Sequence, residues 1–518
     1  MIFMKIAFVT PEISFKDEIP IAGGLGVLSG DIALTFRNYF DFEFHAFSIL
    51  YKKGYVKQKF KDGKIIEEAE TWEYEKILKK EETIKFKDIY IDVWKYEDKN
   101  LKVFLFSSDN EKNDEKIREV TNRLYVDETE EERILKRLIL AYGTFYYIKK
   151  FDYDVIHLNE AFSTWVLIFL LKENIFKKII FTIHTPLEVA FEKFNIKEVE
   201  KFIDLNDLKE FCSFEHFKPY LIAFKLSKFV NAVSKKHKEI SKSQFPQIEE
   251  KLVHVTNGIL IERWMGKNIK KILDEYIPNW FNRIDEIEKE KENLPLKEVL
   301  NAHQKEKEEL INFLKSYNIK IDSKKPIFTF ARRFTQYKRP YLLFSEEKLS
   351  KLDAIFIFSG KAHPKDLLGK QFILQVISIS KALDNVIYIP NYNVKIAKLL
   401  VKGSDFWIIV PKPPLEASAT SFMKAGINGV PSIASRDGAM VEIINENYNG
   451  FFIGKNLFDI EANTDFQDQT ELFEKINFAC ELFKDKLKYA EICKNTLFSF
   501  LPKVDSRRMV SEYINLYK

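Results

Sequence analysis

The sequence contains very little cysteine. Its 518 residues include only Cys212, Cys480 and Cys493, so no disulfide framework is expected and a reducing interior is favoured. The cysteines and histidines do not follow the close spacings of metal ligands, and no metal site is predicted. The sequence therefore excludes a disulfide-rich secreted scaffold.

The chain also lacks an excess of charge of one sign. It has 81 lysines and arginines against 77 aspartates and glutamates, a formal net charge of +4. Nucleic-acid-binding proteins usually carry a concentrated basic surplus, and none is visible, so nucleic acid is excluded as a partner. Basic residues can still gather around an anionic substrate.

Long hydrophobic runs are absent as well. The longest, WVLIFLL at residues 165–171, is far shorter than the roughly 20 residues of a membrane-spanning helix. The apolar start, MIFMKIAFVTPEIS, is too short for a signal peptide and has no small-residue cleavage site, so it is interpreted as a first buried strand. We expect a cytoplasmic protein that does not enter a membrane.

The sequence does contain a repeated alternation of short apolar runs with longer amphipathic segments. This alternation is typical of βα units that build parallel sheets. The predicted fold class is α/β, with two doubly wound, Rossmann-like domains facing each other across a cleft. The strand candidates are KIAFVT, VIHLN, KIIFTIHT, KFVNAVS and KLVHVTNG in the first half and PIFTFAR, AIFIFSG, NVIYIP, DFWIIV and VPSIAS in the second.

A charged stretch at residues 283–310 separates the two sets of strands. Its composition favours a solvated helical linker. We predict an N-terminal Rossmann-like domain at residues 1–270, a charged helical linker at 271–320, a C-terminal Rossmann-like domain at 321–490, and a C-terminal helix at 491–518 that could cross back to the first domain. Nearly every polar cluster follows a predicted strand, where doubly wound sheets bind their ligands.

Two loops of the first half carry candidate ligand-binding residues. In IAGGLGVLSGD, Gly23 and Gly24 open a helix and allow backbone N–H groups to approach an anion, although an ordinary tight turn explains them equally well. The pattern is not G-x-G-x-x-G, so a nicotinamide enzyme is not favoured. His184 in FTIHTP and Asn257 in VTNGI follow strands and could contact a ligand; a structural histidine and an Asn-Gly turn are the alternatives.

The loop FARRFTQYKRP concentrates four cations, namely Arg332, Arg333, Lys338 and Arg339. Such charges repel one another unless an anion compensates them or they spread into water. Guanidinium groups and a lysine suit a phosphate, and the loop follows a predicted strand. We therefore favour an anion site over a solvated charge run.

The segment EASATSFMK places Glu416 eight positions before Lys424. A helix is predicted to begin near Thr420 and Ser421, whose hydroxyl and N–H groups could hold a phosphate. Lys424 would lie one turn inside that helix. Its position alone favours a solvated lysine.

Together these motifs resemble one family, the α-glucan phosphorylases, which are pyridoxal-phosphate-dependent glycosyltransferases of the GT-B fold. The resemblance extends from about Gly23 to Glu442, with the motifs in the order of the family. Its motifs are GGLGVLSGD, ILYKKGYVKQKF, HLNEAFS, FTIHTPLEVAFEKF, NAVSKKH, VTNGI…RW, FARRFTQYKRP, GKAHP, PNYNVKIAKLLVKGSDFW and EASATSFMK…NGVPSIASRDGAMVE.

The resemblance implies a role for each matching residue. Lys424 matches the lysine that holds pyridoxal phosphate as a Schiff base. The matches to catalytic residues are Lys424, Arg333, Lys338 and His184; to cofactor-binding residues, Lys424, Thr420, Ser421, Tyr392, Gly23, Gly24 and Arg332; and to substrate-binding residues, Glu416, Asn257, His184 and Glu160.

The implied reaction is phosphorolysis of an α-1,4-glucan to α-glucose 1-phosphate with retention, in which the cofactor phosphate relays a proton to inorganic phosphate. A neutral amine at Lys424 would require burial or neighbouring cations. The sequence departs from the family's EASGTxNMK at Ala419 and Phe422, and from usual residues at Phe162 and Asn393. A homodimer is one open alternative for the oligomeric state.

Two other functions remain as alternatives. A glycogen or starch synthase that uses a nucleotide sugar has the same fold, but such enzymes generally show E-x7-E, and the second glutamate is replaced here by Lys424. They also resemble KxGGLG at the first loop, where Ile21 and Ala22 stand here. A catalytically inactive glucan-binding protein is the third alternative, motivated by Ala419 and Phe422.

Overall fold

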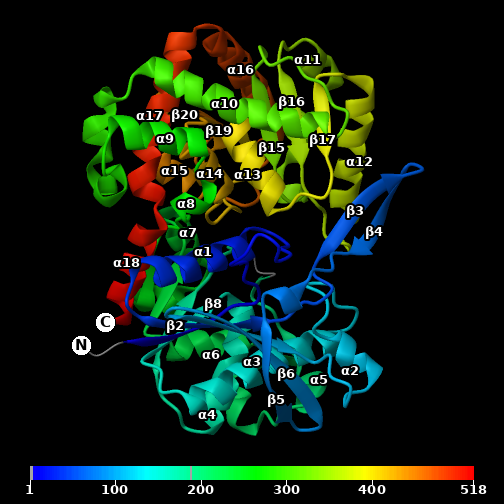
Figure 1. Ribbon diagram of the computed structural model, residues 1–518. Helices are drawn as coiled ribbons and strands as arrows, with labels where there is room; N and C mark the ends of the chain where they lie inside the picture. The colour runs from blue at the N-terminus through cyan, green and yellow to red at the C-terminus, as the bar shows by residue number, and fades with distance from the viewer. Residues whose placement is uncertain (1–3, 187–189) are drawn as a thin grey trace. The chain divides into compact units, whose positions relative to one another are not determined.

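The computed structural model describes residues 4–186 and 190–518, which fall into two compact units. Unit 1 comprises the chain up to Val56, Ala69–Thr256 and Val510–Lys518, and unit 2 comprises Lys57–Glu68 and Asn257–Met509. In each unit, helices surround a sheet (Figure 1). Residues 187–189, inside the FTIHTPLEVAFEKF motif, lie outside the described residues. The domain limits given above stay a prediction.

Unit 1 is built on a nine-stranded sheet with the order β14-β13-β9-β8-β1-β2-β7-β6-β5. Its strands pair in parallel from β14 to β7, and β6 and β5 add an antiparallel edge. Because β1 lies between β2 and β8, the strand order reverses there. The strands are β1 Lys5–Val9, β2 Glu43–Ile49, β5 Lys79–Phe86, β6 Ile89–Asp98, β7 Leu101–Ser107, β8 Val155–Asn159, β9 Lys178–Thr182, β13 Phe229–Ala232 and β14 Leu252–His254.

The central strands of this sheet are buried on both faces. In β1, the run from Ile6 to Val9 is fully buried, as expected for a parallel strand that helices cover on both sides. Three short strands form a separate small sheet, β10 Phe194–Asn195, β11 Cys212–Ser213 and β12 His216–Phe217. The α-helices are α1 Gly24–Tyr39, α2 Glu115–Glu119, α3 Glu130–Lys150, α4 Val166–Lys172, α5 Ile196–Glu200, α6 Pro219–Leu226, α7 Lys235–Gln244 and the end of α18 Ser506–Tyr517.

Helix α18 brings the C-terminal residues onto the sheet of unit 1. His157 in β8 is fully buried, and its two ring nitrogens lie 2.6 Å from the Tyr517 hydroxyl and 2.7 Å from the Thr182 hydroxyl. The Asn231 amide donates to the Tyr513 hydroxyl over 3.4 Å. Burial lowers the pKa of His157 to about 3, so this histidine is a neutral structural residue.

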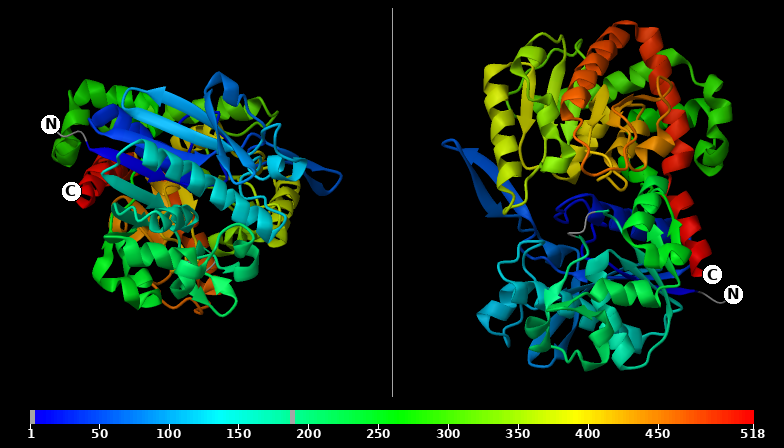
Figure 2. Two further views of the ribbon diagram at one scale, coloured as in Figure 1. Left: turned by 90° about the horizontal axis from the view of Figure 1, so that it is seen from below. Right: turned by 180° about the vertical axis from the view of Figure 1, so that it is seen from behind.

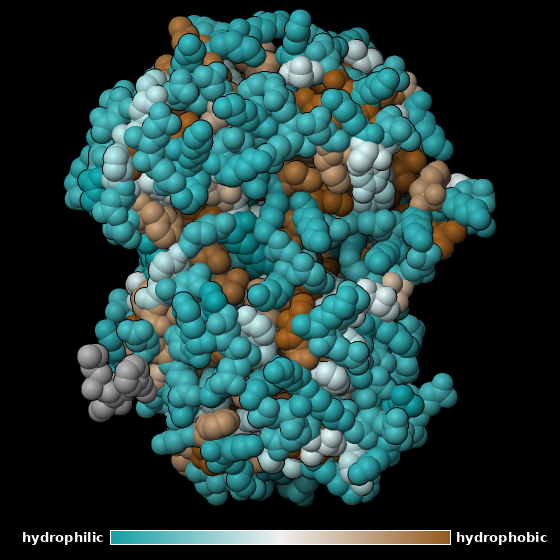
Figure 3. Space-filling view, viewed as in Figure 1, coloured by the Kyte–Doolittle hydropathy of each residue, from teal (hydrophilic) through white to brown (hydrophobic). Residues whose placement is uncertain are grey.

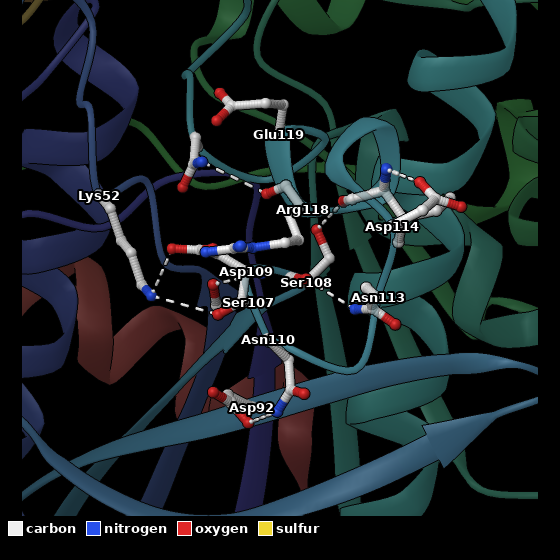
Figure 4. A network of polar contacts seen from close by, with 12 residues as sticks. Lys52, Asp92, Ser107, Ser108, Asp109, Asn110, Asn113, Asp114, Arg118 and Glu119 are labelled. Carbon is white, nitrogen blue, oxygen red and sulfur yellow. Dashed lines mark hydrogen bonds and ion pairs between the residues drawn. The ribbon is translucent and has the colours of Figure 1, made fainter.

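A polar network fixes the loop after β7 (Figure 4). Asp109 accepts from Lys52 Nζ and from Arg118 Nε, each over 2.9 Å. The Asn110 side chain donates to Asp92 over 2.7 Å. The network therefore links this loop to β6 and to α2.

Unit 2 contains a six-stranded parallel sheet with the order β17-β16-β15-β18-β19-β20. Counted along the chain this is the order 3-2-1-4-5-6 of a Rossmann fold, with the switch point between β15 and β18. Figure 2 shows this sheet from two further sides, among its helices. The strands are β15 Ile327–Ala331, β16 Ile355–Ser359, β17 Val386–Ile389, β18 Phe406–Ile409, β19 Ser432–Ser435 and β20 Gly450–Ile453.

Most of the helices of unit 2 pack around this sheet, and a hairpin from early in the chain also belongs to the unit. The hairpin consists of β3 Val56–Lys61 and β4 Lys64–Ala69. The α-helices are α8 Ile261–Trp264, α9 Lys267–Tyr276, α10 Leu296–Lys315, α11 Glu346–Ser350, α12 Leu367–Ala382, α13 Val394–Gly403, α14 Ser421–Gly426, α15 Met440–Ile443, α16 Asp465–Lys484 and α17 Lys486–Val504.

Helix α10, within the charged stretch, buries one of its faces. Lys307 and His303 on this face bind the Asp405 carboxylate, with distances of 2.7 Å and 2.9 Å. The backbone N–H of Ile327 also donates to Asp405 over 2.7 Å. Burial alone would raise the pKa of Asp405, but the Lys307 charge and the hydrogen bonds outweigh it and lower the pKa to about 2. A buried ion network thus attaches α10 to the start of β15.

The predicted α/β fold class with Rossmann-like sheets is confirmed, and all ten strand candidates overlap observed strands. The strands missed in the two large sheets are β2, β5, β6, β7 and β20. The three cysteines are free. The molecular surface seen in Figure 3 is mainly hydrophilic. Within residues 4–186 and 190–518, no helix combines the length and apolar character needed to span a membrane.

Candidate active site

The switch point of the unit 2 sheet brings together two of the predicted motifs. Arg332 directly follows β15, and Glu416 lies in the loop after β18. The Arg332 Nη2 atom lies 2.6 Å from Glu416 Oε2, and Lys338 Nζ lies 3.2 Å from the same oxygen. The cations of FARRFTQYKRP and the carboxylate of EASATSFMK therefore form one buried ion cluster.

The carboxylate of Glu416 is held in its charged form. Burial by itself would raise its pKa, but the charges and hydrogen bonds of Arg332 and Lys338 prevail and lower the pKa to about 2. The backbone N–H of Glu416 donates to Asp437 over 2.8 Å. Gly438 is required here, because its φ is +49° and a Cβ would lie 2.4 Å from the Glu416 carbonyl oxygen.

Several polar atoms in this region are buried and lack a hydrogen-bond partner among the described residues. They are Nε and Nη1 of Arg332, Oδ1 of Asn257 and Oγ of Ser418. Asn257 belongs to the same loop cluster, since its Nδ2 atom donates to the Ser418 carbonyl over 3.4 Å. Buried donors without partners are costly. The two unpartnered guanidinium nitrogens, which carry three N–H groups, therefore provide donors for an acceptor or anion.

Lys424 in α14 is buried, with 7% of its surface exposed, so the solvated lysine that its position favoured is wrong. Its Nζ atom lies 4.0 Å from the centroid of the Trp264 ring. Asn428 joins α14 to α8, because its amide donates to the carbonyl oxygens of Lys424 over 2.8 Å and of Trp264 over 3.0 Å. Tertiary packing of α14 against α8 thus removes the amine from water.

Trp264 is a site residue that the sequence analysis did not single out. Its indole is buried, with 1% exposed, and a tryptophan face attracts an ammonium group at this distance. The only signal was the RW pair at the end of the motif VTNGI…RW. That pair lies 160 positions before Lys424, and sequence spacing could not connect them.

The remaining predicted residues of unit 2 lie on loops after strands or at helix ends. Thr420 precedes α14 and Ser421 begins it, with the Ser421 hydroxyl accepting from Trp407 Nε1 over 3.3 Å. Tyr392 follows β17; its burial raises its pKa, while the charge of nearby Arg332 acts in the opposite direction. Arg333 is the neighbour of Arg332 after β15.

Three of the departures from the family pattern have structural explanations. Phe422 is fully buried, with its ring 5.8 Å from Phe500 in a T-shaped contact. Asn393 caps α13, accepting from the Ile396 N–H over 3.0 Å. Phe162 in unit 1 lies under the guanidinium of Arg137, 4.3 Å from its ring centroid. These residues serve packing and capping.

Arg339 does not join the ion cluster of Arg332, Lys338 and Glu416. It is fully buried and its backbone adopts the left-handed conformation, with φ 52°. Its guanidinium binds Asp465 and Asp468 and donates to the carbonyl oxygens of Val410 and Pro411. The prediction that Arg339 shares an anion with the other cations of the loop is therefore wrong. Its charge is already neutralised by Asp465 and Asp468, which are far away in the sequence.

In unit 1, His184 ends a hydrogen-bond chain beside the switch point. The hydroxyls of Thr10 and Ser29 donate to backbone carbonyl oxygens and accept from Asn159 Nδ2, each over 3.1 Å. The Asn159 oxygen must then accept from His184 Nε2, 2.6 Å away. Burial lowers the pKa of His184 to about 3. The ring is therefore neutral, with its proton on Nε2 and an acceptor lone pair on Nδ1.

Glu160 directly follows β8 and has strained backbone geometry. Its φ of 77° is unusual for a residue with a side chain. Its carboxylate accepts from the backbone N–H of His184 over 3.1 Å. Burial raises the pKa of Glu160 to about 7, the Glu192 carboxylate acts in the same direction, and backbone N–H donors offset part of the effect. Such a carboxyl group is partly protonated near neutral pH.

The glycine loop opens α1 as predicted, with Gly23 as the N-cap and Gly24 as the first helical residue. A Cβ at Gly23 would meet no heavy atom within 4 Å, whereas at Gly26 it would lie 2.7 Å from the Glu12 carboxylate. Glu12, which is 4% exposed, is therefore a neighbour of the glycine loop that the sequence analysis did not single out. Its only signal was its place in the loop after β1, three residues beyond Val9. The structure places Gly23, Gly24, His184 and Glu160 in unit 1 and the other predicted site residues in unit 2.

Comparison with known proteins identifies the family. The family model described as carbohydrate phosphorylase matches residues 156–487, more than half of the chain. This chain belongs to the carbohydrate phosphorylase family and is a glycosyltransferase of the phosphorylase type.

Individual relatives match nearly the whole chain. A glycogen phosphorylase from Aquifex aeolicus is 29% identical, covering 99% of this chain and 86% of the relative. A maltodextrin phosphorylase from Thermococcus litoralis is 31% identical, over 99% of this chain and 70% of the relative. An uncharacterized protein from Methanocaldococcus jannaschii is 26% identical, covering 96% of both chains.

A second family model, described as the starch synthase catalytic domain, matches residues 5–255. Nearly all of this match falls in unit 1. The two models overlap at residues 156–255, and of the two only the carbohydrate phosphorylase model continues beyond residue 255.

Proposed function

We propose that this protein catalyses phosphorolysis of an α-1,4-glucan such as glycogen, starch or maltodextrin, releasing α-glucose 1-phosphate with retention. The names of its relatives, glycogen and maltodextrin phosphorylase, support this substrate class. The observation that carries the proposal is the buried amine of Lys424 in the unit that also holds the unpartnered donors of Arg332. Localisation in the cytoplasm and assembly as a homodimer remain parts of this proposal.

The residues of unit 2 fit pyridoxal phosphate as the cofactor. Lys424 supplies an amine removed from bulk water, and Arg332, Arg333 and Lys338 would hold phosphate groups. Thr420, Ser421 and Tyr392 belong to the proposed cofactor-binding set, with Gly23 and Gly24 from unit 1. When bound, this cofactor supplies a phosphate group that exchanges a proton with inorganic phosphate.

The ion pairs with Glu416 hold the side chains of Arg332 and Lys338 in fixed positions. Glu416 neutralises part of the charge of Arg332 and Lys338, so these side chains are held in place without a bound anion. Two nitrogens of Arg332, Nε and Nη1, still have no partner among the described residues. Donors fixed in advance stabilise developing negative charge without reorganising during the reaction.

Trp264 and Asn428 would orient Lys424. The indole face covers the amine, and Asn428 fixes the backbone of both partners. Together they exclude water from one side of the Lys424 amine and limit the directions in which this side chain can point.

The residues of unit 1 are suited to sugar hydroxyl groups. Neutral His184 presents Nδ1 as an acceptor, and Glu160 can donate when protonated or accept when charged. Asn257 and Glu416 in unit 2 complete the proposed substrate-binding set. No pair of carboxylates of the glycosidase type is needed for phosphorolysis.

A nucleotide-sugar synthase is the second candidate, favoured by the match of residues 5–255 to the starch synthase domain. One assay separates the two reactions. Purified protein is incubated with maltodextrin and inorganic phosphate, or with maltodextrin and a nucleotide glucose, and the products are measured. We expect glucose 1-phosphate in the first reaction, and its loss in Lys424→Ala. Glucan extension only from the nucleotide sugar would overturn the proposal, and activity in neither reaction would favour a glucan-binding protein.

A further inference from the structure

The hairpin β3–β4 contacts the loops that carry the candidate site of unit 2. It belongs to unit 2, although the chain before and after it belongs to unit 1. In Figure 1 the blue hairpin lies beside α12, drawn in yellow, from a distant part of the sequence. Glu67 forms an ion pair with Lys370 of α12 over 3.1 Å, and Lys381 Nζ lies 4.8 Å from the centroid of the Phe60 ring.

Gln58 is the buried centre of this contact, with 3% exposed. Its side-chain amide pairs with the backbone of Ala362 in both directions, since Nε2 donates to the carbonyl oxygen and Oε1 accepts from the N–H, each over 2.9 Å. The second Nε2 proton goes to Glu67 over 2.8 Å. The backbone N–H of Gln58 donates to Asn391 Oδ1 over 2.9 Å. The hairpin thus binds two separate loops through one residue.

Each of these two loops leads to a candidate site residue. Ala362 belongs to the loop after β16, whose Lys361 carbonyl accepts from the Phe334 N–H over 2.9 Å and whose Gly360 packs against Arg332. A Cβ on Gly360 would lie 2.1 Å from the Arg332 carbonyl oxygen. The loop bound by Gln58 therefore supports the backbone of Arg332.

The second loop carries Tyr392 between two fixed asparagines. Asn391 adopts φ 57° and is held by the Gln58 N–H. Asn393 caps α13. The charge of Arg332 reaches the Tyr392 hydroxyl. Gln58 therefore holds two loops, one that supports the backbone of Arg332 and one that carries Tyr392.

We propose that Gln58 is a positioning residue for the site of unit 2, acting by fixing the loops of Arg332 and Tyr392. The role in catalysis rests on the proposed function, whereas the fixing of the loops does not. Loss of this support would weaken the use of phosphate more than the use of glucan, because His184 and Glu160, two of the four residues proposed to bind glucan, belong to unit 1. Misplacement of such groups by about 1 Å is enough for large rate losses.

Gln58→Met tests this role, because it keeps the side-chain length and removes every side-chain hydrogen bond. Lys59→Ala is the matched control: it lies on the same strand, and its partner Glu68 is exposed like Lys59 itself. Gln58→Asn is a second variant that keeps an uncharged amide but withdraws it from the Ala362 backbone by one methylene. Melting temperatures identify which variants are folded, and Gln58→Asn replaces Gln58→Met if the latter does not fold.

Two measurements follow on the complete holoenzyme. Hydrogen exchange is measured for peptides covering residues 332–338 and 386–394, with β20 as reference, and KM and kcat are measured separately for phosphate and maltodextrin. We expect faster exchange in the peptide covering residues 332–338 and a smaller change in that covering residues 386–394, whose bond from the backbone N–H of residue 58 to Asn391 is kept. We also expect at least a tenfold loss of kcat/KM for phosphate and less than a threefold change of KM for maltodextrin. Lys59→Ala should change none of these values more than twofold.

The outcomes separate this proposal from the proposed function. Unchanged exchange in a folded Gln58 variant overturns the fixing of the loops, and faster exchange with unchanged phosphate kinetics overturns the role in positioning. Faster exchange in a protein whose wild type shows no phosphorolysis removes the proposed function but supports Gln58 as the residue that fixes the loops.

Discussion

The ion cluster at Glu416 makes a quantitative prediction about stability. The pKa of Glu416 is about 2 instead of the ordinary 4.5. Because one pKa unit corresponds to about 1.36 kcal/mol, the folded protein favours the charged carboxylate by roughly 3 kcal/mol. Glu416→Gln, which mimics the protonated form and leaves Arg332 and Lys338 uncompensated, should lose about that amount near pH 7.

The assay is calorimetric melting of both proteins in buffer without phosphate or sulfate. For a unit of this size, about 1 kcal/mol corresponds to a shift of about 2–4 °C, so the variant should melt roughly 6–12 °C lower. Since the folded pKa lies below the unfolded value, this stabilisation is present above pH 4.5 and is lost as the pH falls towards 2. The difference between the two proteins should therefore shrink in acid.

Glu347→Gln is the matched control, because Glu347 forms an ion pair with Lys351 and both side chains are largely exposed. That change should cost less than about 1 kcal/mol. Adding phosphate should raise the melting temperature of Glu416→Gln more than that of the wild type, since an anion can replace the missing carboxylate. A variant that melts within about 2 °C of the wild type, or does not respond to phosphate, would refute this reasoning.

Two further changes test buried charges, one in each unit. Asp405→Asn should destabilise unit 2 by about 3–5 kcal/mol, because it leaves the buried Lys307 ammonium without its carboxylate; calorimetry checks this, and a loss under about 1 kcal/mol would contradict it. Glu160 has a folded pKa of about 7, above its ordinary 4.5, so its stabilising contribution is present below pH 4.5 and lost as the pH rises through 7. Glu160→Gln should therefore raise the melting temperature of unit 1 by a few degrees at pH 8 and much less at pH 5, and an equal gain at both pH values would show that the charge is not responsible.

The sequence was sufficient to predict many, though not all, of the strands whose residues are buried on both faces. Such strands are continuous apolar runs, as in β15 and β16, where every residue is buried. β2 was missed because His45 interrupts its apolar pattern. The His45 ring is nevertheless buried, and its Nδ1 atom lies 2.6 Å from the Tyr153 hydroxyl. β5 was missed because it is a mainly charged edge strand, and β20 begins with a glycine, which weakens the strand pattern.

The candidate site was predictable mainly where its residues lie close to the ends of strands. Arg332 and Glu160 directly follow strands, His184 comes two residues after β9, and the parallel topology places them at strand ends. The burial of Lys424 depends on Trp264, and the burial of Arg339 depends on Asp465 and Asp468. These partners are far away in the sequence, so local pattern could indicate neither environment. The support from Gln58 likewise depends on an early hairpin that belongs to the second unit.

The central claim, that Lys424 carries pyridoxal phosphate, is tested most directly by mass spectrometry after borohydride reduction. Purified protein is loaded with the cofactor, reduced and digested, with Lys412 as an internal comparison in the same unit. We expect a pyridoxyl group on the peptide containing Lys424 and none on that containing Lys412. Modification at other lysines with an unmodified Lys424 would contradict the account.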